Sequence, residues 1–292
     1  MSDMILRGTA FDNQFRIFAV QSTATVQKAR DLHDLSPLAT ILLGKLLSAA
    51  AMMSWDLKNP LAESTIRVDA EGPLGGAVAI CTAEGKVRGY AMHPELFIED
   101  NPRDNLFTGK HLGKGTLTVI RNGAVKTPYM GTCALVSGEI AEDVAEYYLQ
   151  SEQIPTAVNL GLLIDKDATI RSSGGYIIQQ LPFAKAEAAE LISNNINATP
   201  NVSDLMDMGY GIRDILDKFI FKGIEWQETD AKEISYQCTC SKQRFADALR
   251  LLGSKELEEM VDGISPVCHY CNSTYDFSTD DMKDIIRSLE EA

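Results

Sequence analysis

The sequence predicts an α+β protein: an N-terminal domain with a mixed sheet and packed helices, a helical linker, and a small C-terminal domain organised by cysteines. Strand and helix patterns mix up to about residue 181 without strict β–α alternation. Helical patterns dominate the next fifty or so residues, and four of the six cysteines lie in two close pairs near the C-terminus. The expected domains are residues 1–181, 182–231 and 232–292.

Short segments of alternating or continuous apolar residues predict the strands of the first domain. Ile5–Ala10 and Phe15–Gln21 flank a polar turn and are typical of a β-hairpin. The other expected strands are Thr65–Ala70, Ala77–Thr82, Val87–Ala91, Gly115–Arg121, Tyr129–Ser137, Thr156–Ile164 and Ala168–Gln179.

Glycines in this domain indicate tight backbone geometry. Gly174 and Gly175 lie inside an expected strand and predict a bulge or a close backbone approach. The segment Glu71–Gly76 lacks both the Gly-Lys-Ser/Thr ending and the Gly-x-Gly-x-x-Gly pattern of nucleotide-binding loops, so it is interpreted as a tight turn.

Two helices are expected in the first domain. Ser36 and Pro37 suit the N-cap and first turn of a helix that continues through the apolar residues Leu38 to Trp55. Lys45 interrupts this apolar stretch, which favours a buried helix over a membrane span. A second helical pattern covers Ile140–Gln150.

The linker is expected to contain three short helices, at residues 184–196, 202–208 and 211–221. Helices this short are marginal alone and depend on docking. The last carries an apolar stripe that we expect to pack on the sheet of the first domain, which makes the linker a candidate switch element. The stripe consists of Ile212, Ile215, Leu216, Phe219 and Ile220.

The cysteine pairs are Cys238-x-Cys240 and Cys268-x-x-Cys271. Four thiolates in two pairs suit a tetrahedral Zn²⁺ site, whose Zn–S bonds are about 2.3 Å. His269 is not expected to be a ligand, because four cysteines already complete the site. Domains of this size rarely have an adequate core, and structural zinc contributes about 10–16 kcal/mol, so metal loss should unfold the domain.

Two other interpretations of the cysteines are less favoured. Free cysteines are often small core residues, which suits the isolated Cys81 and Cys133 better than two close pairs. A structural disulfide framework suits secreted proteins, but the first residues show no apolar signal-like region. The expected location is therefore cytoplasmic.

Charge and motif content restrict the function. The formal net charge of −14 argues against nucleic acid as a partner, and no membrane partner is expected. His33, His93 and His111 have no spacing partners, and no catalytic serine, carboxylate pair or hydrolase motif is recognisable. We therefore expect a protein that is not an enzyme and has no catalytic residues.

Several motifs resemble one known family across the whole chain. The specific part is Tyr236-x-Cys238-x-Cys240-Ser241-x-x-Arg244-Phe245 followed by Cys268-x-x-Cys271 and Tyr275-x-Phe277. Supporting segments follow in the expected order. The pattern resembles the bacterial redox-regulated heat-shock holdase chaperones of thirty-three kilodaltons. The supporting segments are Val68–Gly75, Gly85–Tyr90, Ser137–Glu139, Ser151–Pro155 and Gly174–Gln179.

The resemblance implies a chaperone that works without ATP and is inactive while reduced and zinc-bound. Under oxidative stress, members of this family pair cysteines within each motif, here Cys238 with Cys240 and Cys268 with Cys271, and release zinc. The zinc domain and the linker then lose structure, and the protein forms a homodimer. Apolar surface becomes available to hold unfolding client proteins.

Two alternative functions remain open from the sequence. One is a zinc-ribbon binding module fused to an unrelated α+β domain, for example for nucleic acid, against which the acidic charge argues. The other is a thiol-disulfide oxidoreductase, which needs an exposed Cys-x-x-Cys beside a βαβ unit. No such unit precedes Cys268.

Overall fold

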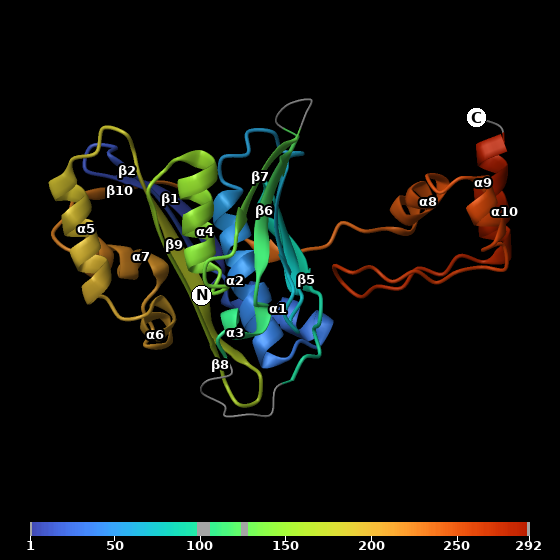
Figure 1. Ribbon diagram of the computed structural model, residues 1–292, viewed down its shortest axis with the longest axis horizontal. Coiled ribbons are helices and arrows are strands. Elements are labelled where there is room, and N and C mark those ends of the chain that lie inside the picture. The colour runs from blue at the N-terminus through green and yellow to red at the C-terminus, as the bar shows by residue number, and fades with distance from the viewer. Residues whose placement is uncertain (1, 98–105, 124–127, 291–292) are drawn as a thin grey trace. The chain divides into compact units, whose positions relative to one another are not determined.

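The computed structural model describes residues 2–97, 106–123 and 128–290 (Figure 1). It divides into two compact units, Met1–Gln237 and Cys238–Ala292. Among the described residues, no helix combines the length and hydropathy that crossing a bilayer would require. The first unit contains two sheets and most of the helices, which confirms the predicted α+β class.

The first sheet has five antiparallel strands. The hairpin predicted at the N-terminus forms its centre, as β1 (Met4–Ala10) and β2 (Phe15–Gln21). Strands β8 (Thr156–Ile164) and β9 (Ile170–Gln180) extend the sheet on one side, and β10 (Trp226–Glu233) is the edge strand on the other. The strand order is β10-β1-β2-β9-β8.

The second sheet has six strands in the order β11-β5-β4-β3-β6-β7. Its two-residue edge strand β11 runs parallel to β5, whereas the other pairs are antiparallel, so this sheet is mixed as predicted. The strands are β3 (Glu63–Ala70), β4 (Gly76–Thr82), β5 (Lys86–Ala91), β6 (Gly115–Asn122), β7 (Tyr129–Ala134) and β11 (Ser235–Tyr236).

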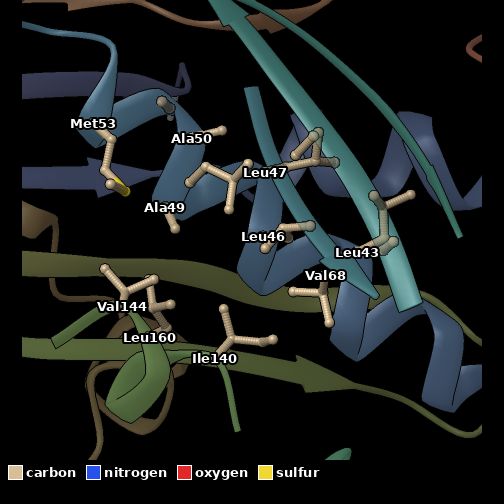
Figure 2. Close-up of a cluster of buried hydrophobic side chains, with 14 of the residues drawn as sticks. Leu43, Leu46, Leu47, Ala49, Ala50, Met53, Val68, Ile140, Val144 and Leu160 are labelled. Carbon is tan, nitrogen blue, oxygen red and sulfur yellow. The ribbon is translucent and has the colours of Figure 1, made fainter. Parts of the chain in front are cut away.

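Helix α2 (Pro37–Met53) forms the centre of the main core. It begins at the predicted cap, where the Ser36 side chain accepts a hydrogen bond from the Ala39 amide at 3.3 Å. Its apolar side chains pack with Val68 of β3 and with Leu160 of β8, so the helix is buried by both sheets (Figure 2). Lys45, the one charge in the helix, pairs with Glu139 at 3.1 Å.

The first unit also contains helices α1, α3 and α4 and the π-helical turn η1. Helix α1 (Thr23–His33) was not predicted; its first amides donate to the carboxylate of Asp3, which lies far from any local capping position. Helix α4 (Ala141–Tyr147) continues into the π-helical turn η1 (Tyr148–Glu152), close to the predicted range. Helix α3 is a single turn, Gly109–Leu112.

The predicted glycine features are close approaches and a turn. A Cβ on Gly175 would lie 2.1 Å from the Asn159 carbonyl oxygen, and the irregular pairing of β8 with β9 falls instead at Leu163/Ile164. Gly75 and Gly76 have φ of +69° and +132°, as the tight turn between β3 and β4 requires. The pair at Gly174–Gly175 is therefore a close backbone approach and not a bulge.

A layer of short helices covers the other face of the first sheet (Figure 1). It consists of α5 (Ala186–Ala198), α6 (Val202–Asp207), α7 (Ile212–Ile215) and the π-helical turn η2 (Leu216–Ile220). Four residues of the predicted apolar stripe are at most 1% exposed, and they pack with sheet residues that include Ile17, Tyr176 and Ile178. The expected docking of the stripe on the sheet is therefore present.

Strand β10 is absent from the sequence prediction, which extended the helical linker to residue 231. Trp226–Glu233 is mostly polar because it is an edge strand, paired on one side with β1 and exposed on the other. The compact units meet at Gln237/Cys238, six residues after the expected start of the last domain. The division into three functional segments stays a prediction.

The second unit contains three helices and a cysteine-bearing hairpin. The helices are α8 (Lys242–Arg250), α9 (Ser254–Glu258) and α10 (Thr279–Glu290). Bridges at Ile264↔Phe277 and Val267↔Thr274 form the hairpin. Its core is small: the buried apolar residues are Ala246, Leu249, Leu257, Phe277, Met282 and Ile285, together with the partly buried side chains around them.

Candidate metal centre

The first cysteine pair lies on extended backbone immediately before α8. Ser241 caps that helix, with its hydroxyl accepting from the Arg244 amide at 3.2 Å. The Arg244 guanidinium then reaches back to the carbonyl and hydroxyl oxygens of Thr239, at 3.0 and 2.6 Å. Arg244 thus fixes the residue between Cys238 and Cys240, and both thiols are half-buried.

The second pair lies on a tight turn at the tip of the hairpin. The amides of Cys271 and Asn272 both donate to the Cys268 carbonyl, at 3.3 and 2.8 Å, and the Cys268 amide donates to the Ser273 carbonyl at 2.9 Å. Asn272 has a left-handed φ of +55°, which lets the chain turn back. This turn directs both cysteine sulfurs to one side.

The two pairs come together into one cluster of four sulfurs. All four Sγ atoms lie within 4.8 Å of one another. The Sγ atoms of Cys238 and Cys268 are 3.8 Å apart, and those of Cys240 and Cys271 are 3.3 Å apart. A tetrahedral ion with metal–sulfur bonds of about 2.3 Å requires sulfurs about 3.8 Å apart, so these four residues fit such an ion.

The chemistry of the donors narrows the class of metal. Four thiols offer only soft ligands, which suit zinc, copper(I) or iron–sulfur chemistry and not magnesium or calcium. Among the described residues, the group of possible ligands consists of the four cysteines and does not include His269, whose exclusion from the site stays a prediction.

Burial and hydrogen bonding make the four thiols unequal. Burial raises the pKa of Cys238 and of Cys268. Burial also acts to raise the pKa of Cys271, but hydrogen bonds with the side chain and backbone of Ser273 and with the Cys240 and Cys238 sulfurs outweigh it and lower the pKa to about 7. A bound divalent cation would deprotonate all four, because metal binding releases the protons of its thiol ligands.

The remaining cysteines lie in the main core, as predicted. Cys81 is 0% exposed and Cys133 is 4% exposed. Burial raises the pKa of each thiol to about 11. Neither belongs to the four-sulfur cluster.

Two hydroxyl groups lie beside the sulfurs, and the sequence analysis did not predict either contact. The Tyr275 hydroxyl lies 3.0 Å from Cys240 Sγ, and the Ser273 hydroxyl lies 3.3 Å from Cys271 Sγ. Arg244 and Tyr275 stood in the motif that carries the resemblance, but spacing alone does not show that their side chains return to the cysteines.

The comparisons with known proteins identify the family. A family model described as Hsp33 protein matches residues 3–278. The chain belongs to the Hsp33 family. A "33 kDa chaperonin" of Lachnoclostridium phytofermentans is 38% identical over 289 residues, covering 98% of this chain and 99% of the relative. One of Desulforamulus reducens is 38% identical over 294 residues, covering 100% and 99%.

A solved Hsp33 structure supports the fold. The crystal structure of the 33 kDa chaperonin of Thermotoga maritima matches with a TM-score of 0.89 and 33% identity, covering 100% of both chains. The resemblance inferred from the sequence motifs is thereby confirmed. The Hsp33 relatives are named as chaperonins, and this chain is a chaperone and not an enzyme.

Proposed function

We propose that the chain is a redox-regulated, ATP-independent holdase of the bacterial cytoplasm. The observation that carries the proposal is the four-sulfur cluster, which lies in a unit whose own apolar core is small. A bound Zn²⁺ ion would supply the charge that keeps Cys238, Cys240, Cys268 and Cys271 as thiolates. The folded second unit is then the reduced, inactive state.

Oxidation is proposed to proceed by ordinary peroxide chemistry. A cysteine thiolate attacks one oxygen of hydrogen peroxide, the O–O bond breaks, hydroxide leaves, and a sulfenic acid forms. A second thiolate attacks that sulfur and displaces another hydroxide as the disulfide forms. Each pair thus loses two electrons, and one peroxide becomes two waters after taking up two protons.

The proposed products are the Cys238–Cys240 and Cys268–Cys271 disulfides, which close the smallest loops. In the structure, two sulfur–sulfur contacts instead join the two motifs, Cys240 with Cys271 at 3.3 Å and Cys238 with Cys268 at 3.8 Å. Peptide mapping after peroxide treatment distinguishes the two patterns. Mainly cross-motif bridges would refute the proposed pairing.

The loss of thiolate ligands removes the main stabilising interaction of the second unit. The helical layer α5–η2 is proposed to lose structure next, since its elements are short and covered on one face only. Its release would uncover the apolar face of the first sheet, including Phe15, Ile17 and Ile178. We propose that unfolding client proteins bind this state and that it forms a homodimer.

Zinc content, free-thiol count and suppression of client aggregation, measured before and after peroxide treatment with mild heat, test the function. The reduced chain should hold one zinc through four sulfurs and suppress aggregation weakly. The oxidised chain should lose zinc and four free thiols, and it should suppress aggregation without ATP. Equal suppression in both states would refute redox control, and no suppression in either would refute the holdase function.

A further inference from the structure

The hydrogen bonds to the four clustered sulfurs come from two kinds of donor. Backbone groups close in sequence contact three of the sulfurs: Cys240 contacts Cys238, Tyr270 contacts Cys268, and Ser273 contacts Cys271. Cys240 Sγ lies 3.0 Å from the hydroxyl of Tyr275, a side chain outside both motifs, and 3.3 Å from Cys271 Sγ. The conservative substitution Tyr275→Phe therefore removes the hydroxyl at Cys240 and keeps the aromatic ring.

The position of Tyr275 ties the two cysteine motifs together. Tyr275 follows the second motif, whereas Cys240 belongs to the first. The ring packs against Phe245 at a centroid distance of 5.0 Å, and the Tyr275 backbone is held by its amide, which donates to the Pro266 carbonyl at 3.0 Å. The hydroxyl is thus aimed at Cys240 by packing that does not involve the cysteines.

The direction of this hydrogen bond follows from the chemistry of a thiolate. A thiolate sulfur has no proton, so it can only accept, and the phenol must donate. A hydrogen bond to a charged acceptor is stronger than one between neutral groups. It also draws charge from the sulfur, and a less basic thiolate is a weaker nucleophile.

We propose that Tyr275 is a positioning residue of the metal centre: its hydroxyl holds the Cys240 thiolate in place and lowers its reactivity towards oxidants and alkylating agents. This inference rests on the proposed function, because it concerns the same cysteines as thiolate ligands. Oxidation should therefore begin at another cysteine of the cluster. Cys240 should react only after its contact with the Tyr275 hydroxyl is broken.

The test uses the full-length reduced chain and the variant Tyr275→Phe, which keeps the ring and its contact with Phe245. Zinc affinity is measured by competition with a chromogenic chelator. At saturating zinc, the alkylation rate of each cysteine is measured by mass spectrometry. We expect about tenfold weaker zinc binding, the lower end of outer-shell effects, and faster alkylation of Cys240 relative to the other three.

The matched control is Ser265→Ala, which removes a hydroxyl of the same hairpin that donates to Asp276 at 2.6 Å and not to a cysteine sulfur. It should change zinc affinity by no more than about twofold, well below the outer-shell range. Equal zinc affinity in Tyr275→Phe and wild type would overturn the inference. So would an equal rise in alkylation at all four cysteines, or an effect of Ser265→Ala as large as that of Tyr275→Phe.

These outcomes separate this inference from the proposed function. If the wild-type chain binds no zinc through these cysteines, the proposed function fails first. If the wild type binds zinc and becomes a holdase on oxidation while Tyr275→Phe behaves identically, only the role of Tyr275 fails.

Discussion

The two compact units differ in what holds them together. The first unit buries two large apolar clusters, one around α2 between the sheets and one beneath the helices α5–η2. In the described part of the second unit, one small apolar cluster has six buried residues, and four cysteine sulfurs lie together. Domains this small seldom fold on an apolar core alone. The first unit is therefore expected to owe its stability to apolar packing, and the second to the ligands of its cysteine cluster.

The border between the units is marked by Tyr236, two residues before Cys238. Its side chain is 2% exposed, and its hydroxyl donates to the Gly89 carbonyl at 2.7 Å and accepts from the Gly89 amide at 3.2 Å. His33 Nε2 lies 2.9 Å from the same oxygen. These contacts of Tyr236 all lie within the first unit. They should therefore persist whether the cysteines are reduced or oxidised.

Metal removal should produce the largest effect. A strong chelator under reducing conditions should unfold residues 238–292 and leave the strands of the first unit folded, because structural zinc is worth about 10–16 kcal/mol in small domains. Hydrogen exchange with mass spectrometry measures both units in one experiment. Retained protection across α8 and α10 in the metal-free chain would show that the small core suffices.

Two truncations test the border. A chain ending at Gln237 should keep the melting temperature of the first unit, because it retains β10 and β11. A chain ending at Thr229 loses Ile234 and Tyr236, which are 5% and 2% exposed. Each such buried side chain contributes roughly 1.5–3 kcal/mol, so several kcal/mol of stability should be lost. Equal melting of the two truncations would place the border earlier in the chain.

The helical layer should respond strongly to a change at its buried face. Ile215 is 0% exposed, and Ile215→Ala should lower the stability of the layer by about 2–5 kcal/mol. We expect higher holdase activity in the reduced protein and faster exchange across residues 186–220. The control is Leu191→Ala in α5, where the side chain is 42% exposed and the effect should be small. If reduced Ile215→Ala exchanges faster but stays inactive, the layer does not gate client binding.

The smallest effect is expected at the Tyr236 hydroxyl. Tyr236→Phe keeps the buried ring but leaves the Gly89 groups and His33 without that partner, at a cost of about 1–3 kcal/mol. Exchange should rise at β11 and the end of β10, with zinc content unchanged. Loss of zinc from this variant would show that the two units do not separate at this residue.

Much of the fold was predictable from local patterns. The β1–β2 hairpin, helix α2 with its Ser36–Pro37 start and the buried stripe around Ile215 follow from periodicity, capping and turn chemistry. Strand β10 did not, because an exposed edge strand needs no apolar alternation. Helix α1 did not either, since its amides are capped by the distant Asp3.

The candidate site shows the same limit. The two cysteine pairs predict a cluster because each motif is short and holds its two sulfurs close together. The Tyr275–Cys240 contact depends on how the hairpin folds over α8, which no local pattern encodes.

The central claim is that the state of four sulfurs controls the folding of the second unit and the helical layer but not the sheets. Hydrogen exchange of the full-length chain, compared between the reduced zinc-loaded form and the peroxide-oxidised form, tests it most directly. We predict lost protection across residues 238–290 and 186–220 and retained protection in β1–β9. Unchanged protection of the helical layer after zinc release, or simultaneous loss in the sheets, would contradict it.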